Sequence, residues 1–128
     1  MKRAFVLAGA SLLAACQTAT QPTVNPRTSD AAHALQTRLA ETVKTCWFAG
    51  DAAFASYVYS PEINADAPRI LITPRKEPSG RPVLVIEPNS ATTADVYGPM
   101  LASPMGARVR ADVGRWLNGA SDCGAAQG

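Results

Sequence analysis

The longest amphipathic pattern in the chain covers residues 29–48. Large apolar side chains recur there at spacings of four, four, three and one, which places them on one stripe of a helix. The stripe consists of Leu35, Leu39, Val43, Cys46 and Trp47. Ser29 and Asp30 are suited to begin this helix, because either side chain can accept a hydrogen bond from the free amides of the first turn. Gly50 is suited to end it.

Four shorter segments have the composition of β-strands. They are residues 53–60, 69–73 and 82–87 and, as the shortest, 93–97. Residues 74–80 form a loop that joins the second segment to the third, so we expect these two strands to be antiparallel. Residues 70–72 and 83–86 are apolar at every position. This indicates that both faces of these strands are covered, by a helix on one side or by a partner on the other.

A second amphipathic helix is expected after Ser103 and Pro104, because a capping residue followed by proline is typical of a helix start. Its apolar stripe consists of Met105, Val109, Val113, Trp116 and Leu117. Asn118 and Gly119 end it. A second, smooth face provides either room for close packing or a groove for another chain. That face is formed by Ala107, Ala111 and Gly114.

The order of these elements predicts an α+β fold. It consists of an N-terminal helix, an antiparallel sheet of three or four strands joined as hairpins, and a C-terminal helix. Both helices are expected on one face of the sheet.

The start of the chain has a different pattern, in which Lys2 and Arg3 precede an apolar run over residues 4–14. This run has the roughly 7–15 residues of an export signal and is shorter than the about 20 residues of a membrane-spanning helix. Residues 17–28 contain two prolines and almost no large apolar side chain. We therefore expect a signal peptide followed by a flexible linker.

The apolar run ends in a leucine, two small residues and a cysteine, which are Leu13, Ala14, Ala15 and Cys16. This pattern resembles the lipobox of bacterial lipoproteins. The resemblance implies that Cys16 carries diacylglycerol on its sulfur, that the chain is cut before it, and that the new amine is acylated. In Gram-negative lipoproteins an aspartate directly after the cysteine tends to retain the protein at the inner membrane, and this chain has Gln17 there.

The chain is thus similar to small Gram-negative outer-membrane lipoproteins, and the resemblance divides it into three parts. Residues 1–15 are the lipoprotein signal peptide, residues 16–28 the lipidated cysteine and linker, and residues 29–128 a single small periplasmic domain. The implied location is the periplasmic face of the outer membrane, held by the lipid anchor. In element order the domain is also loosely similar to the C-terminal domains of the TonB and TolA proteins, through Trp47, residues 78–81 and the pair Arg115 and Trp116. No function follows from that likeness.

Removal of the signal peptide changes both the charge and the cysteine count. The net charge of +2 includes Lys2 and Arg3, so the charges of the remaining side chains sum to about zero. A net charge near zero does not favour binding to nucleic acid. Lipidation of Cys16 leaves Cys46 and Cys123, which are expected to pair in an oxidising periplasm and to clamp the ends of the two helices together. The alternative is two buried free thiols.

Residues with catalytic chemistry are few. His33, the only histidine, is expected at the exposed start of the first helix, which does not suit a catalytic base beside its nucleophile. No metal or nucleotide motif is present, so no cofactor or metal site is expected. Three acids at strand ends could act as paired carboxylates in glycan hydrolysis, or could simply be solvated. These acids are Glu62, Asp66 and Glu87.

One aromatic pair is a candidate partner-binding surface. Tyr57 and Tyr59 lie on the same side of their strand, opposite Val58. If Val58 faces the core, the tyrosines form an exposed aromatic strip of the kind enriched at interfaces; alternatively, the rings cover the open face of the sheet. We expect a non-enzymatic envelope protein that binds a periplasmic or outer-membrane protein in an assembly, stability or accessory role. The alternative is a small cell-wall glycan binder or hydrolase.

Overall fold

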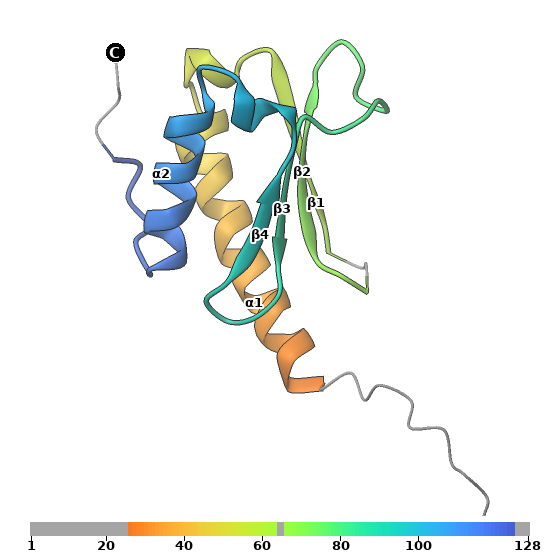
Figure 1. Cartoon of the computed structure of the whole chain (residues 1–128), viewed down its shortest axis with the longest axis vertical. Helices are drawn as coiled ribbons and strands as arrows, with labels where there is room; N and C mark the ends of the chain where they lie inside the picture. Colours follow the sequence, from red (N-terminus) through yellow and green to blue (C-terminus); the bar gives the residue numbers. More distant parts are fainter. Residues whose placement is uncertain (1–25, 64–65, 125–128) are drawn as a thin grey trace, which may run out of the picture.

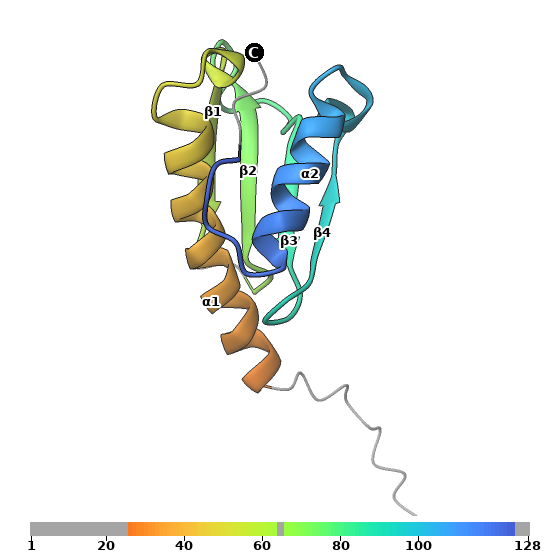
Figure 2. The ribbon, with the colours of Figure 1, turned by 90° about the vertical axis from the view of Figure 1, so that its left-hand side faces the viewer.

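Two helices lie on one face of a four-stranded antiparallel sheet (Figures 1 and 2). The computed structural model describes residues 26–63 and 66–124. The expected signal peptide, the lipobox with Cys16, and residues 17–25 of the linker lie outside the described residues. The predicted α+β class, the antiparallel hairpins and the placement of both helices on one face are confirmed.

The first helix, α1 (Pro26–Val43), begins three residues earlier than predicted. A proline is well tolerated in a first helical turn because its missing N–H has no partner there in any case. The helix continues as a π-helical turn, η1 (Lys44–Phe48), where a regular helix was expected. The predicted stripe is nevertheless buried along its whole length, from Leu35 at 2% exposure to Trp47 at 0%.

The sheet is a simple meander. Its strands are β1 (Tyr57–Glu62), β2 (Arg69–Pro74), β3 (Leu84–Pro88) and β4 (Ala94–Tyr97), and they are hydrogen-bonded in the order β1-β2-β3-β4. The first strand begins four residues later than predicted, because a 3-10 turn, η2 (Ala52–Phe54), occupies the expected start. The side chain of Asp51 caps this turn by accepting a hydrogen bond from the amide of Ala53 at 2.9 Å.

The core lies between the sheet and the two helices. Ile70 and Ile72 of β2 stand opposite Ile86 and Leu84 of β3, and all four are fully buried. Because side chains alternate along a strand, Leu71 and Val85 point to the other face, which no helix covers. The helices therefore cover one face of these strands, as expected, and cover by a partner on the other face stays a prediction.

The second helix, α2 (Gly106–Leu117), follows a 3-10 turn, η3 (Pro99–Ala102). The predicted start at Ser103 and Pro104 is wrong, because α2 begins two residues later, with Met105 as its N-cap and no side-chain cap. The Ser103 hydroxyl accepts from the amide of Met105 at 3.2 Å in the turn before the helix. Gly106 permits a close approach: a β-carbon there would lie 2.0 Å from the carbonyl oxygen of Leu101. Close packing on the smooth face of α2 is not found, since its two alanines are exposed and nothing lies within 4 Å of a β-carbon added at Gly114.

The disulfide between Cys46 and Cys123 is confirmed, with the two α-carbons 4.9 Å apart. It joins η1, which follows α1, to the segment that follows α2. Arg38 of α1 adds a second connection by donating to the carbonyl oxygen of Trp116 at 2.7 Å. The two helices are thus linked near their C-terminal ends, and the alternative of two free thiols is wrong.

We expect the double substitution Cys46→Ala/Cys123→Ala to lower the free energy of unfolding by about 2–5 kcal/mol, because the 77-residue cross-link restricts the unfolded chain. Urea unfolding followed by tryptophan fluorescence measures the change. The wild-type protein under reducing conditions is the matched control and should show the same loss. An unchanged midpoint in both would contradict this role of the disulfide.

Candidate functional site

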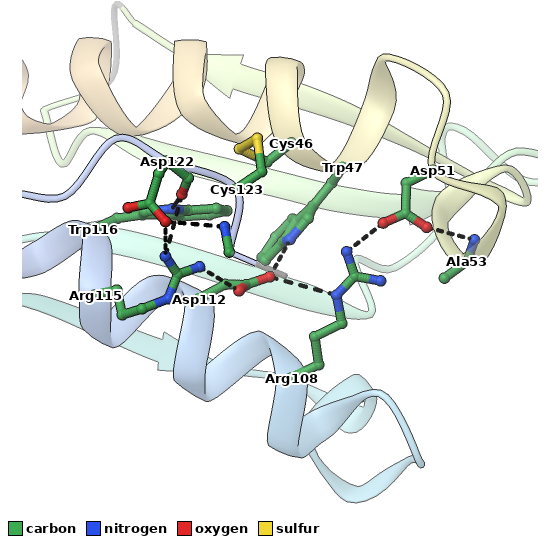
Figure 3. A network of polar contacts seen from close by, with 11 residues as sticks. Cys46, Trp47, Asp51, Ala53, Arg108, Asp112, Arg115, Trp116, Asp122 and Cys123 are labelled. Carbon is green, nitrogen blue, oxygen red and sulfur yellow. Dashed lines mark hydrogen bonds and ion pairs between the residues drawn. A yellow bond between two sulfur atoms is a disulfide. The ribbon is translucent and has the colours of Figure 1, made fainter. Parts of the chain in front are cut away.

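The most connected polar side chain of the described residues is Asp112 on α2, whose side chain is only 9% exposed. Its Oδ2 accepts from the indole Nε1 of Trp47 at 2.9 Å, and its Oδ1 accepts from Nη2 of Arg115 at 2.8 Å (Figure 3). Arg108 Nε lies 3.5 Å from Oδ2, one helical turn away. The buried carboxylate is thereby paired on both oxygens, as a charge in the interior requires.

The two arginines extend these contacts in opposite directions. Arg108 pairs with Asp51 at the cap of η2 and lies 5.4 Å from the ring centroid of Phe54. Arg115 pairs with Asp122 at 2.9 Å, directly before the disulfide. We call this set the aspartate–arginine network, and it consists of Asp51, Arg108, Asp112, Arg115 and Asp122. Figure 3 shows that it runs along one side of α2 from η2 to the C-terminal segment.

The ion pairs of the network shift the pKa values of several of its members. The hydrogen bond from Arg108 lowers the pKa of the Asp51 carboxyl, and the same bond raises the pKa of Arg108. The hydrogen bond to Asp112 raises the pKa of Arg115. These shifts favour the charged forms of Asp51, Arg108 and Arg115 around neutral pH, where a general acid or base must exchange a proton. These three groups therefore suit ion pairing that stabilises the fold rather than proton transfer.

The aromatic side chains on the inner face contradict the predicted Tyr57 and Tyr59 strip. The Tyr59 ring lies 4.9 Å from that of Phe48, and the Tyr57 ring lies 6.5 Å from that of Phe54. Both tyrosines are half-buried on the helix-covered face, so Val58 points to the open face rather than to the core. The exposed strip and the alternative of rings on the open face are both wrong. The partners that turn the rings inward come from η1 and η2.

The three strand-end acids are not brought together as a catalytic pair. Glu62 accepts from Arg69 Nε at 2.8 Å, and Glu87 accepts from the hydroxyl of Tyr97 at 3.1 Å. Arg69 lies on the strand between the two glutamates, where a glycosidase needs room for the sugar. The third acid, Asp66, is exposed in the connection between β1 and β2. The arrangement is typical of paired surface charges and does not favour hydrolysis.

The tyrosine and the arginine of this group both have raised pKa values, for different reasons. Although Tyr97 is 46% exposed, partial desolvation, followed by the hydrogen bond to Glu87, raises its pKa. The hydrogen bond to Glu62 raises the pKa of Arg69. Among residues 26–63 and 66–124, no cluster of His, Cys, Asp and Glu could hold a metal ion. His33 lies half-buried on α1 and is less exposed than expected.

Two hollows lie at the end of the sheet where β1 begins and β2 ends. The larger has a volume of about 510 Å³, and its lining includes Tyr57, Pro74, Arg75, Lys76 and Val83. The smaller has a volume of about 260 Å³, and its lining includes Trp47, Phe48, Asp51 and Phe54. Ala55 and Arg75 line both hollows, so the two adjoin. This site is not predictable from apolar periodicity, because its walls come from three separate strand ends.

A comparison of the chain with protein-family models, with curated proteins and with solved structures finds no match. In the part of the chain that the structure describes, no helix has both the length and the apolar composition needed to cross a membrane.

We expect Asp112→Ala to lower the free energy of unfolding by about 2–4 kcal/mol, because it leaves the Trp47 indole and two guanidinium groups without their shared acceptor. Asp122→Ala is the matched control: its side chain is 69% exposed, so a much smaller loss is expected. Chemical denaturation of both variants measures the difference. Equal losses would contradict the central position of Asp112.

The lowered pKa of Asp51 predicts a pH dependence of stability. Its contribution is fully present above the unfolded pKa of about 3.9 and is lost as pH falls through the lower folded value. Between about pH 5 and pH 2, the melting temperature of wild type should therefore fall more steeply than that of Asp51→Asn. Calorimetry measures the melting temperatures of both proteins across this pH range. Parallel curves would show that the Arg108 pair contributes no proton-linked stability.

Proposed function

We propose that the protein is a lipid-anchored protein of the cell envelope that binds another envelope component and does not act as an enzyme. The anchor is the expected lipid on Cys16, and the linker would connect it to the first turn of α1. The hydrocarbon chains, at about 0.8 kcal/mol per buried methylene, would hold the protein without any contribution from the domain. The folded domain is then free to present a binding surface away from the membrane.

One observation carries this proposal. The start of α1 and the β2–β3 loop lie at opposite ends of the molecule (Figure 1). The end that faces away from the anchor therefore bears the two hollows, together with the basic residues Arg75, Lys76 and Arg81. A lipid anchor at one end of the domain and an accessible hollow at the other suit a protein that binds a partner away from its own membrane.

The acidic groups support a non-catalytic role. Asp51 and Asp112 are held in ion pairs within the aspartate–arginine network. Glu62 is held by Arg69, and Glu87 accepts from Tyr97. A glycan hydrolase needs two carboxylates that reach the substrate, and these contacts occupy Glu62 and Glu87, two of the three acids that the alternative would use. We therefore favour binding over hydrolysis.

Membrane fractionation with partner capture tests both parts of the proposal. Cys16→Ser should abolish labelling of the protein with acyl chains and leave an uncleaved precursor. Among lipidated variants, Arg75→Gln/Lys76→Gln should reduce co-purification of any protein that wild type retains from detergent-solubilised membranes. Arg110→Gln is the matched control, because this exposed arginine also donates to a carbonyl, that of Leu101 at 3.1 Å.

Two results would contradict the proposal. Cys16→Ser that matures normally and stays in the membrane fraction would remove the lipid anchor. A set of captured proteins that is the same for wild type and for Arg75→Gln/Lys76→Gln would remove the membrane-distal end as the binding surface.

A further inference from the structure

The larger hollow combines an apolar floor with a basic rim. The floor is formed by Tyr57, Pro74 and Val83, which come from the ends of three strands, and the rim carries Arg75 and Lys76. Its volume of about 510 Å³ falls within the roughly 300–1,000 Å³ of typical small-molecule sites. None of its lining residues is acidic. Its shape and charge therefore favour a ligand that is apolar in its body and anionic at one end.

Arg75 is fixed in position without being neutralised. Its Nε donates to the carbonyl oxygen of Ala55 at 3.0 Å, and its Nη2 donates to that of Tyr57 at 3.2 Å. Both acceptors are uncharged, whereas Arg69, Arg108 and Arg115 are all paired with carboxylates. The guanidinium keeps its full positive charge, and its orientation is set before any ligand binds. Such preorganisation lowers the entropic cost of binding.

Lys76 adds a second positive charge. Among the described residues its side chain makes no hydrogen bond or ion pair. The nearest acid in sequence is Glu77, whose side chain folds back within the loop: a β-carbon added at Gly80 would lie 3.4 Å from its Oε2. Asp51, which lines the adjoining hollow, is already paired with Arg108. No carboxylate of the described residues therefore neutralises the rim.

We propose that this hollow binds the free C-terminal end of a short peptide. The carboxylate lies against Arg75 and Lys76, and the apolar side chains of the last residues lie on Tyr57, Pro74 and Val83. The planar guanidinium suits a carboxylate, because its N–H groups form two parallel hydrogen bonds with the two oxygens. The inference rests on the proposed function, since it names the ligand class for the membrane-distal end of the domain.

Calorimetric titration of the full chain in detergent tests the ligand class. The probe is acetyl-Ala-Val-Leu with a free carboxylate, compared with the same peptide as its amide, with octanoate and with inorganic phosphate. We expect the free acid to bind at least about tenfold more tightly than the amide, because a charge-assisted hydrogen bond is lost. Binding should weaken at high salt. Octanoate and phosphate should each bind more weakly than the peptide acid.

Variants test the site. Arg75→Gln should weaken binding of the peptide acid by about tenfold or more, and Lys76→Gln by a smaller factor. Arg110→Gln should leave binding unchanged. Arg75 also donates to the carbonyl groups of Ala55 and Tyr57, so its substitution changes structural contacts as well as charge. Arg75→Lys is therefore included, because it retains the charge. Circular dichroism confirms that each variant is folded, and Lys76→Gln tests the site independently of those carbonyl contacts.

Several results would overturn the inference. Equal binding of acid and amide would exclude the carboxylate, and equal or tighter binding of octanoate or phosphate would exclude the peptide. If no probe binds while Arg75→Gln/Lys76→Gln still reduces partner capture, the ligand class is wrong and the proposed function stands. If neither peptide binding nor partner capture depends on these residues, both the ligand class and the proposed function are wrong.

Discussion

The burial of one carboxylate constrains the packing of this domain. Asp112 lies under α2 with its side chain only 9% exposed, and an unpaired charge at such a position would cost several kcal/mol. Its two oxygens are satisfied by groups from two helices: the indole of Trp47 from η1, and the guanidinium groups of Arg108 and Arg115 from α2. The relative position of η1 and α2 is thus fixed by hydrogen-bond geometry as well as by apolar contact.

The surrounding contacts follow from that constraint. With its N–H directed at Asp112, the Trp47 ring stacks on Phe54 at a centroid distance of 4.6 Å and contacts Trp116 at 5.0 Å. Phe54 is thereby held in η2, where Asp51 caps the turn and pairs with Arg108. On the other side, Arg115 and the disulfide hold the C-terminal segment in place. One small core is therefore stabilised by a continuous set of directional contacts, which is how a short chain compensates for limited apolar burial.

Much of the fold was predictable because apolar periodicity reports which residues face a core. The stripe from Leu35 to Trp47 and the strands around Ile70 and Ile86 were found for this reason, and the disulfide followed from the cysteine count. The orientation of Tyr57 and Tyr59 was not predictable, because alternation fixes only that they share a face. Which face they share depends on Phe48 and Phe54, whose rings reach them through the turns η1 and η2. The hollow at the strand ends was missed for a related reason, since it depends on tertiary proximity.

The arginines illustrate the limit of sequence reasoning most clearly. Counting formal charges treats all of them alike and gives a sum of about zero when Lys2 and Arg3 are left out. In the structure, Arg69, Arg108 and Arg115 are neutralised by carboxylates, whereas Arg75 is held only by backbone carbonyls. A net charge near zero therefore coexists with a local excess of positive charge at one end of the domain. Because electrostatic recognition depends on that local field rather than on the total, a total charge that does not favour nucleic-acid binding is compatible with a site for a single carboxylate.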